Sequence, residues 1–208
     1  MSRLAPGAFA ALLATLCAAA QSLPERRLED LSVAQLSPKL TYTLKDARLS
    51  VQERNDILAV IGNVVPPSAF PTGHDMDRRD YLLGAFVGSV DLAGNGSRQV
   101  AVTFGSDRMM CGATGNCNIW LFSLEYGQAK LILDSNGWGL TVRPETTHGL
   151  RDVVVESHQS AWDTALEVFQ FNGARYKQVD CYKIRQPQQA GAAPRIVSCS
   201  EPPDSSKQ

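Results

Sequence analysis

The chain has 208 residues, of which 44% are hydrophobic and 20% are charged, and its formal net charge is −1. This composition supplies enough apolar side chain for one globular core, so it excludes a chain that is disordered throughout. The pI of about 6.3 argues against binding of nucleic acid through the phosphate backbone, because proteins that do so are usually basic. Beyond residue 25, no apolar run is long enough for a helix to span a membrane.

Residues 1–20 have the features of a secretory signal peptide. A basic residue near the start precedes a short apolar stretch, and Ala18 and Ala20 occupy the −3 and −1 positions of an A-x-A cleavage site. We therefore predict cleavage before Gln21 and export to the periplasm or the medium, which leaves the mature protein without a transmembrane anchor. An uncleaved anchor and a lipoprotein modified at Cys17 are the alternatives.

Cleavage would leave four cysteines, Cys111, Cys117, Cys181 and Cys199. An even number in an exported chain predicts disulfide bonds, and three connectivities are possible. We favour Cys111–Cys117 and Cys181–Cys199, because local pairs close the shortest loops, which would contribute about 2 and about 3 kcal/mol of stability. A zinc site is the alternative, but the spacings differ from the usual C-x2-C pairs.

Residues 21–80 form a polar lead-in that contains one predicted helix. Ser50 and Glu53 have the spacing of a capping box, and apolar residues follow them at helical intervals. The helix should cover about 51–61 and end at Gly62 and Asn63, which favour termination.

Residues 81–185 have the pattern of an antiparallel β domain. Short apolar and β-branched runs alternate with Gly and Asn turns at intervals of roughly ten residues, a spacing typical of hairpins rather than of crossover helices. The predicted strands are 83–91, 99–104, 118–125, 130–134, 140–143, 152–157, 165–171 and 176–184. The fold class is therefore α+β and mainly β, an antiparallel sandwich or open barrel with a short N-terminal helix. A Pro/Gln/Ser-rich tail, 186–208, follows and is tied back by Cys199.

The β domain contains an internal similarity. The aligned pairs are 95–102 with 148–155, 121–124 with 168–171, and Gly127 with Gly173. Each unit would contain a turn, a strand, a long loop, a strand, a glycine turn and a further strand. We therefore expect two related hairpin units, with chance similarity between hairpins as the alternative.

These units resemble the FG-GAP repeats of integrin alpha-chain propellers and of many secreted bacterial proteins. In that family an Asp-rich loop that contains a glycine follows a strand, and Asp91, Asn95 and Gly96 match the first, fifth and sixth positions of the loop. Ala93 and Gln99 stand where the family has further oxygen ligands, and two copies are too few to close a propeller. The resemblance implies a hairpin architecture and an exported setting.

The end of the β domain is similar to another group of proteins. The segment Phe171-Asn172-Gly173-Ala174-Arg175-Tyr176 matches the closing hairpin of a class of small exported bacterial proteins. That class has no assigned function, so the similarity implies export and leaves the activity open.

The loop after Asp91 is a candidate calcium site, because calcium binds converging oxygen ligands. Only Asp91 is anionic there, and Asn95 adds one neutral oxygen, so we expect an Asx turn in which both side chains bond nearby backbone. No spacing requires a transition-metal site, for which the candidate ligands would be His74, His148, His158, Asp75 and Asp77. We assign no metal and no cofactor.

A hydrolase would need an activated nucleophile or paired carboxylates. Glu156 and His158 would share one face of a strand, a geometry that suits general-base chemistry, and His148 could join them. Ser157 would point to the opposite face, and the sequence has no G-x-S-x-G or phosphate-binding glycine motif. These residues do not establish catalysis.

Trp138 and Trp162 are the candidate ligand contacts. Trp138 lies between two glycines and Trp162 in a loop before a strand, positions where an indole ring is often exposed. Trp120 has the spacing of a core residue and should be buried. Exposed rings can line a groove for a sugar or a peptide, or they can fill the open end of a small β core.

Together these features favour an exported, non-catalytic binding or interaction protein, with inhibition of an envelope enzyme as one form of that function. The partner would be a protein or a glycan of the cell envelope. The alternative is an envelope hydrolase that uses His158, Glu156 and His148. A buried, convergent cluster of these side chains would favour the enzyme, and scattered, solvated positions would favour the binder.

Overall fold

A computed structural model of the chain describes residues 40, 42–65, 77–105, 111–186 and 194–200. The predicted signal peptide, residues 1–20, lies outside these ranges, and so do His74 and Asp75. Within them the chain forms two helices and ten strands. None of the described helices is long and apolar enough to cross a membrane.

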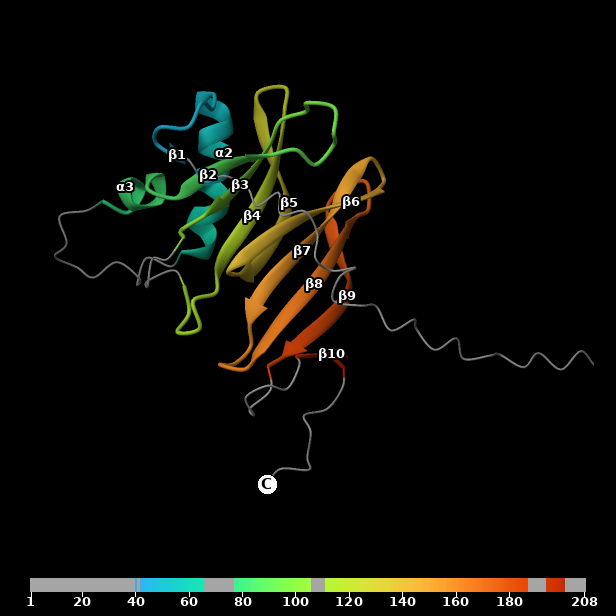
Figure 1. Cartoon of the computed structure of the whole chain (residues 1–208). Coiled ribbons are helices and arrows are strands. Elements are labelled where there is room, and N and C mark those ends of the chain that lie inside the picture. The colour runs from blue at the N-terminus through green and yellow to red at the C-terminus, as the bar shows by residue number, and fades with distance from the viewer. Residues whose placement is uncertain (1–39, 41, 66–76, 106–110, 187–193, 201–208) are drawn as a thin grey trace, which may run out of the picture.

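The strands form two antiparallel sheets of five strands each (Figure 1). The first sheet contains, in spatial order, β1 (Tyr42–Thr43), β2 (Phe86–Val90), β3 (Gln99–Thr103), β4 (Cys117–Glu125) and β5 (Gln128–Gly137). The second contains, in spatial order, β10 (Arg195–Ser198), β9 (Tyr176–Arg185), β8 (Asp163–Phe171), β7 (Leu150–His158) and β6 (Gly139–Thr147). The predicted mainly β fold is confirmed, in the form of a sandwich with a short helix.

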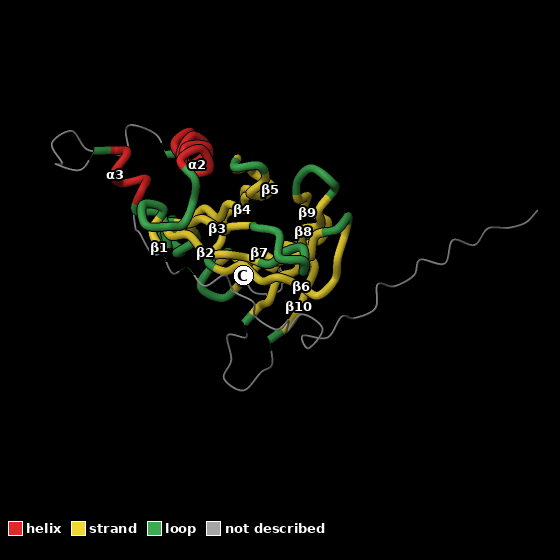
Figure 2. Tube along the Cα trace, turned by 90° about the horizontal axis from the view of Figure 1, so that it is seen from above, coloured by secondary structure: helices red, strands yellow, loops and turns green. Residues whose placement is uncertain are grey.

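The first sheet is the middle layer of the molecule (Figure 2). On one of its faces, helix α2 (Val51–Val64) packs over buried side chains that include Trp120 and Phe122. On the other face, Leu121 packs in a second core with Val153 of the second sheet. Because both faces are covered, β3 and most of β4 are buried at consecutive positions rather than at alternate ones.

Helix α2 begins where the sequence predicts. The Oγ atom of Ser50 accepts a hydrogen bond from the Glu53 N–H (3.0 Å), and Glu53 Oε2 accepts one from the Ser50 N–H (2.7 Å). This reciprocal pair is the predicted capping box. It satisfies backbone donors that an isolated helix would leave without partners.

The predicted end of α2 at Gly62 is wrong, because the helix continues to Val64. Arg78, the first residue of α3 (Arg78–Leu83), donates hydrogen bonds to the carbonyl oxygens of Gly62 and Val65 and so satisfies the last turn of α2. The sequence pattern does not predict α3, which Asp77 caps, because six residues are too few to show a helical period.

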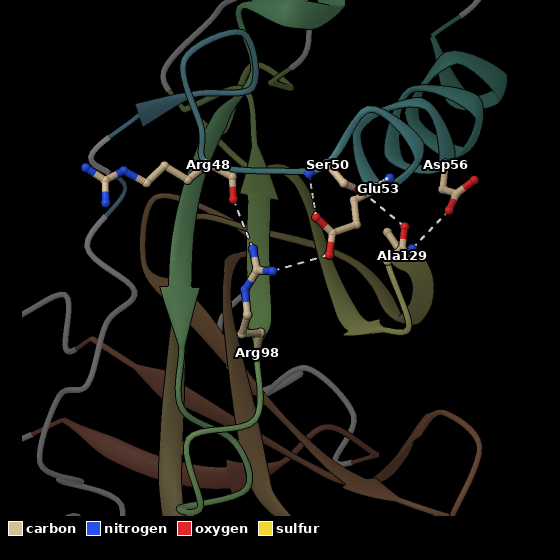
Figure 3. A network of polar contacts seen from close by, with 7 residues as sticks. Arg48, Ser50, Glu53, Asp56, Arg98 and Ala129 are labelled. Carbon is tan, nitrogen blue, oxygen red and sulfur yellow. Dashed lines mark hydrogen bonds and ion pairs between the residues drawn. The ribbon is translucent and has the colours of Figure 1, made fainter.

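A polar network ties the N-terminus of α2 to the first sheet (Figure 3). The Glu53 side chain is buried, and its Oε1 atom lies 3.4 Å from Nη1 of Arg98, which directly precedes β3. Arg98 also donates a hydrogen bond to the carbonyl oxygen of Arg48 (3.0 Å). Nearer the middle of the helix, Asp56 Oδ2 accepts the N–H of Ala129 in β5 (2.9 Å). Helix α2 is therefore bonded to both the β3 and β5 sides of the sheet.

The two sheets contain equivalent four-strand meanders, β2–β5 and β6–β9. The segments aligned in the sequence occupy equivalent strands: 99–102 in β3, 152–155 in β7, 121–124 in β4 and 168–171 in β8. The pairing register shifts between Leu121 and Phe122 in the first meander and between Val168 and Phe169 in the second, and these positions are aligned. The two aligned units therefore agree in strand order and in the position of the register shift.

Both predicted disulfides are present. Cys111–Cys117 closes a short loop at the start of β4, and Cys181–Cys199 joins β9 to the residue after β10. The sequence does not predict β1 or β10, and β10 makes part of the predicted tail a strand. Disulfides of this kind are typical of proteins that fold in an oxidising environment.

Candidate functional site

The chain passes from the first sheet to the second at Trp138, the single residue between β5 and β6. Its backbone N–H donates a hydrogen bond to the carbonyl oxygen of Glu156 in β7 (2.8 Å). Gly137 packs so closely against the same carbonyl that a Cβ atom there would overlap its oxygen. The backbone is thus pressed onto β7, while the side chain of Trp138 remains 51% exposed.

The indole of Trp138 stacks on the imidazole of His158, the last residue of β7. The ring centres are 5.2 Å apart and the planes differ by 9°. The Asn116 amide holds the His158 backbone, because its Nδ2 donates to the His158 carbonyl (2.8 Å) and its Oδ1 accepts from the His158 N–H (2.8 Å). Since Asn116 belongs to the loop that the Cys111–Cys117 disulfide closes, the disulfide, the amide and the stacked rings form one connected support.

An apolar groove of about 380 Å³ opens beside Trp138. Besides Trp138, most of its lining consists of aliphatic side chains, glycine backbone and a half-cystine: Leu40, Ala101, Val102, Ile119, Leu140, Gly105, Gly115, Gly137, Gly139 and Cys117. Thr103 contributes a hydroxyl-bearing side chain, and no charged side chain is among the described residues that line the groove. This lining favours an apolar group as the ligand and offers few side-chain hydrogen bonds.

Trp162 is also exposed, but it does not line the groove. Its ring is 52% exposed and lies in the turn between β7 and β8. The backbone around it is fixed, because the Trp162 N–H bonds Ser160 Oγ (3.1 Å) and its carbonyl accepts from the Gln186 N–H (2.8 Å). Trp120 is fully buried, as predicted. Of the two candidate ligand contacts, Trp138 therefore lines this groove and Trp162 does not.

The residues of the alternative hydrolase site do not converge. Glu156 and His158 share one face of β7, but His148 lies in the exposed turn before that strand, about 26 Å from Glu156 and about 33 Å from His158 at roughly 3.3 Å per residue. Ser157 is buried on the opposite face, where its hydroxyl accepts a hydrogen bond from Gln159 (2.9 Å). Among the described residues, none forms a hydrogen bond with the His158 imidazole. The His158 imidazole therefore belongs to an aromatic stack with Trp138, and His148 and Ser157 do not join it.

The candidate calcium ligands bond to their own turn. Asp91 Oδ1 accepts the Gly94 N–H (2.7 Å), and Asn95 Oδ1 accepts the Ser97 N–H (3.0 Å). A second Asp91 oxygen lies 4.0 Å from Arg151 Nη1. These side chains therefore form the Asx turns that the sequence predicts.

Burial raises the pKa of two carboxyl groups that lie away from the groove. The pKa of Glu167 on β8 is raised by desolvation, and desolvation also raises the pKa of Asp134 on β5, against the attraction of Arg175. Carboxyl groups with raised pKa values indicate catalysis when they converge in a cleft. Neither Glu167 nor Asp134 contributes to the shift of the other, so the two groups show no sign of being such a pair.

The contact of Trp138 with His158 is the part of the site that the sequence does not predict. The glycines on either side of Trp138 indicate a close backbone approach at this point of the chain, but they do not indicate which residue the ring contacts. No pattern indicates that Asn116 would hold His158, since this contact depends on how the disulfide loop meets β7. No family model, no curated protein and no solved structure matches this chain. The inference of function therefore rests on the chemistry of the groove and of the stacked rings.

Proposed function

We propose that this protein is an exported, non-catalytic binding protein that holds a large apolar side chain of a protein partner in the groove beside Trp138. An apolar groove lies beside a half-exposed indole that already stacks on the His158 imidazole, and this combination supports the proposal most strongly. A ring held in one orientation loses little conformational freedom when a partner packs against it.

The size and lining of the groove support an apolar anchor residue as the ligand. About 380 Å³ is near the lower end of the range for ligand sites, roughly 300–1,000 Å³, so it suits one or two side chains better than a large cofactor. Fully desolvated aromatic contacts of this kind dominate the energetics of many protein interfaces.

A glycan is a weaker candidate than a protein. Sugar hydroxyls need several hydrogen-bonding side chains around an aromatic ring, whereas the described lining offers the Thr103 hydroxyl and backbone groups. A hydrolytic function has less support still, because His148 and Ser157 lie away from the His158 imidazole.

The proposed export rests on the predicted signal peptide and is consistent with the two disulfides. The resemblance of residues 91–99 to an FG-GAP loop fits the same setting. A disulfide-bonded scaffold with a preformed site suits inhibition of an envelope enzyme, and this is the form of binding that we favour.

Selection from a displayed peptide library on the oxidised protein tests the groove. We expect the enriched peptides to share one large apolar residue. Trp138→Ala should weaken their binding by at least about tenfold, because it removes one wall of the site. Leu40→Arg should have a similar effect, because it places a charge beside the apolar lining, whereas Trp162→Ala is the matched control and should bind as the unchanged protein does.

The chain contains three tryptophans, so the indole N–H signals in an NMR titration provide a second readout. The signal of Trp138 should shift on addition of an enriched peptide, while that of Trp162 should not. Peptides that bind equally well to the Trp138→Ala and Leu40→Arg variants, or a library without any groove-dependent peptide, would contradict the proposal.

A further inference from the structure

The tip of the β4–β5 hairpin carries an aromatic residue in an unfavourable backbone conformation. Glu125 pairs with Gln128, which leaves a two-residue turn of Tyr126 and Gly127, and both have a positive φ, 53° and 75°. Turns of this kind strongly favour Asn or Asp before Gly, because a bulky side chain strains the left-handed conformation. The side chain of Tyr126 is 102% exposed, so no packing within the described fold compensates for this strain.

The corresponding turn of the second meander reverses the chain without a tyrosine, through a longer loop, because Phe171 pairs with Tyr176 and leaves four residues between them. Gly173 aligns with Gly127 and also has a positive φ, and the residue before it is Asn172. The Asn172 side chain stabilises its own turn by accepting the Ala174 and Arg175 N–H groups (3.0 and 2.9 Å). The first unit therefore has an exposed aromatic ring where the second has a turn-forming side chain.

The Tyr126 hairpin is braced before any partner arrives. Ser50 Oγ donates a hydrogen bond to the Gly127 carbonyl (3.2 Å), and Asp56 Oδ2 accepts the Ala129 N–H (2.9 Å), so both contacts join the hairpin to α2 (Figure 3). Residues strained in the left-handed region of the backbone cluster at ligand-binding and active sites when the surrounding structure holds them there. A pre-organised hairpin also binds a partner with little additional ordering.

The surroundings of Tyr126 indicate the chemistry of the partner. Val51, which follows the serine that contacts the turn, is 76% exposed and is a second exposed apolar side chain at the end of α2 that is bonded to the turn. Among the four turn residues, Glu125 is the charged one. A complementary surface would therefore have an apolar pocket for the ring and a basic side chain at the rim facing Glu125.

We propose that the Tyr126 hairpin tip is a second docking surface, which inserts Tyr126 into an apolar pocket with a basic rim on a folded protein partner. It is separate from the groove beside Trp138. The turn precedes Gln128 at one end of β5, and the groove adjoins Gly137 at the other end, about 30 Å away along a ten-residue strand. In Figure 1 the turn is at the top of the view, at the free end of the β4–β5 hairpin.

Four forms of the oxidised protein, used as baits, test this surface: the unchanged chain, Tyr126→Asn, Tyr42→Ser and Trp138→Ala. Tyr42 is the matched control, because it is an exposed tyrosine on β1, away from the turn. Envelope and medium fractions of the cells that encode the protein are passed over each bait, and the captured proteins are compared by quantitative mass spectrometry. Any protein lost from the Tyr126→Asn bait is purified, and its Kd is measured against all four forms.

We expect Tyr126→Asn to raise that Kd by at least about tenfold, while Tyr42→Ser and Trp138→Ala leave it unchanged. Tyr126→Asn should also leave the Tm unchanged or raise it, because Asn tolerates the left-handed conformation. Equal capture by all four baits, including capture of nothing by any of them, overturns the proposal. A clear fall in Tm with Tyr126→Asn also overturns it, because the tyrosine would then serve the fold. A species lost from both the Tyr126→Asn and Trp138→Ala baits would show one continuous interface and overturn the separation of the two surfaces.

Discussion

Gly137 is the position at which the fold leaves no room for a side chain. A Cβ atom there would overlap the carbonyl oxygen of Glu156 and would lie 2.7 Å from Cγ1 of Val155. Both of these atoms belong to β7, whose backbone also accepts the Trp138 N–H. The close approach therefore determines where the chain changes sheets and where the Trp138 ring is presented.

The substitution Gly137→Ala should lower the free energy of unfolding by about 2–3 kcal/mol, because the added methyl group must displace backbone or core atoms. Gly112→Ala is the matched control. The nearest atom to a Cβ at that position is 3.8 Å away, so the change should stay within about 0.5 kcal/mol. Urea denaturation of both variants measures the difference, and equal stabilities would show that β5 and β7 can separate freely here.

At the level of elements, the first turn of α2 is attached to the β3 side of the sheet through Glu53. The Glu53 carboxylate bonds the Ser50 N–H with one oxygen and approaches Arg98 with the other, although Arg98 itself is largely exposed. A carboxylate this deeply buried depends on these partners, because burial of an unpaired charge is costly. The network thus ties helix geometry to the start of β3.

The substitution Glu53→Ala should reduce the free energy of unfolding by about 2–3 kcal/mol, since it removes a cap and leaves the Ser50 N–H without its acceptor. Glu53→Gln keeps the capping geometry and should cost less, about 1 kcal/mol. The control is Arg48→Ala, because the Arg48 side chain points away from the network and only its carbonyl takes part (Figure 3). Chemical denaturation followed by circular dichroism gives the three values, and an Arg48 effect as large as that of Glu53→Ala would contradict this account.

At the scale of the whole molecule, the core between the two sheets links stability to alkaline pH through Tyr176. Its hydroxyl donates to the Arg151 carbonyl (2.6 Å), and its ring is buried in the core that the sheets share. Burial, and then the negative charge of Asp152, raise the pKa of Tyr176 well above its ordinary value. The folded state therefore holds the Tyr176 proton more tightly than the unfolded state does.

This contribution to stability is complete below the unfolded pKa, about 10, and is lost as the pH rises from there toward the folded pKa. Tyr176→Phe should be less stable at pH 7 by about 1 kcal/mol, because it loses the hydrogen bond. Between pH 10 and 12, however, the free energy of unfolding of Tyr176→Phe should fall less steeply with pH than that of the unchanged protein. The two slopes should differ by up to about 1.4 kcal/mol per pH unit, the value for one proton. Tyr42→Phe, at an exposed site, is the control, and parallel pH profiles for Tyr176→Phe and the unchanged protein would show that the proton is not held.

Much of the fold could be predicted because its signals are local. The eight strands from β2 to β9 overlap the apolar runs between turn residues. The even number of cysteines in a chain predicted to be exported indicated disulfides, and loop length selected the two pairs. The elements that the pattern does not reveal are β1, α3 and β10, with two, six and four residues. Such short elements are stabilised by contacts with neighbouring elements, and they are too short to show a periodic pattern in the sequence.

The candidate site is less predictable, because its parts meet only after the sheets have formed. Exposure of Trp138 followed from its glycine neighbours, but its partner His158 comes from the far end of another strand. The groove also needs Leu40 from the lead-in and Cys117 from the disulfide loop. Residues from such separate segments leave no common sequence pattern. The fold is therefore needed to show that Trp138 lines the groove and Trp162 does not.

The Cys111–Cys117 disulfide has a consequence for thermodynamic linkage between oxidation state and ligand binding. Cys117 lines the groove, and the loop that it closes holds His158 through Asn116. A ligand that binds only the ordered groove must favour the oxidised loop, and linkage requires the effect to be reciprocal. An occupied groove would therefore make this disulfide harder to reduce. The equilibrium constant for reduction would change by the same factor by which reduction raises the Kd of the ligand. Titration of the free thiols against a graded reductant would then report whether the groove is occupied.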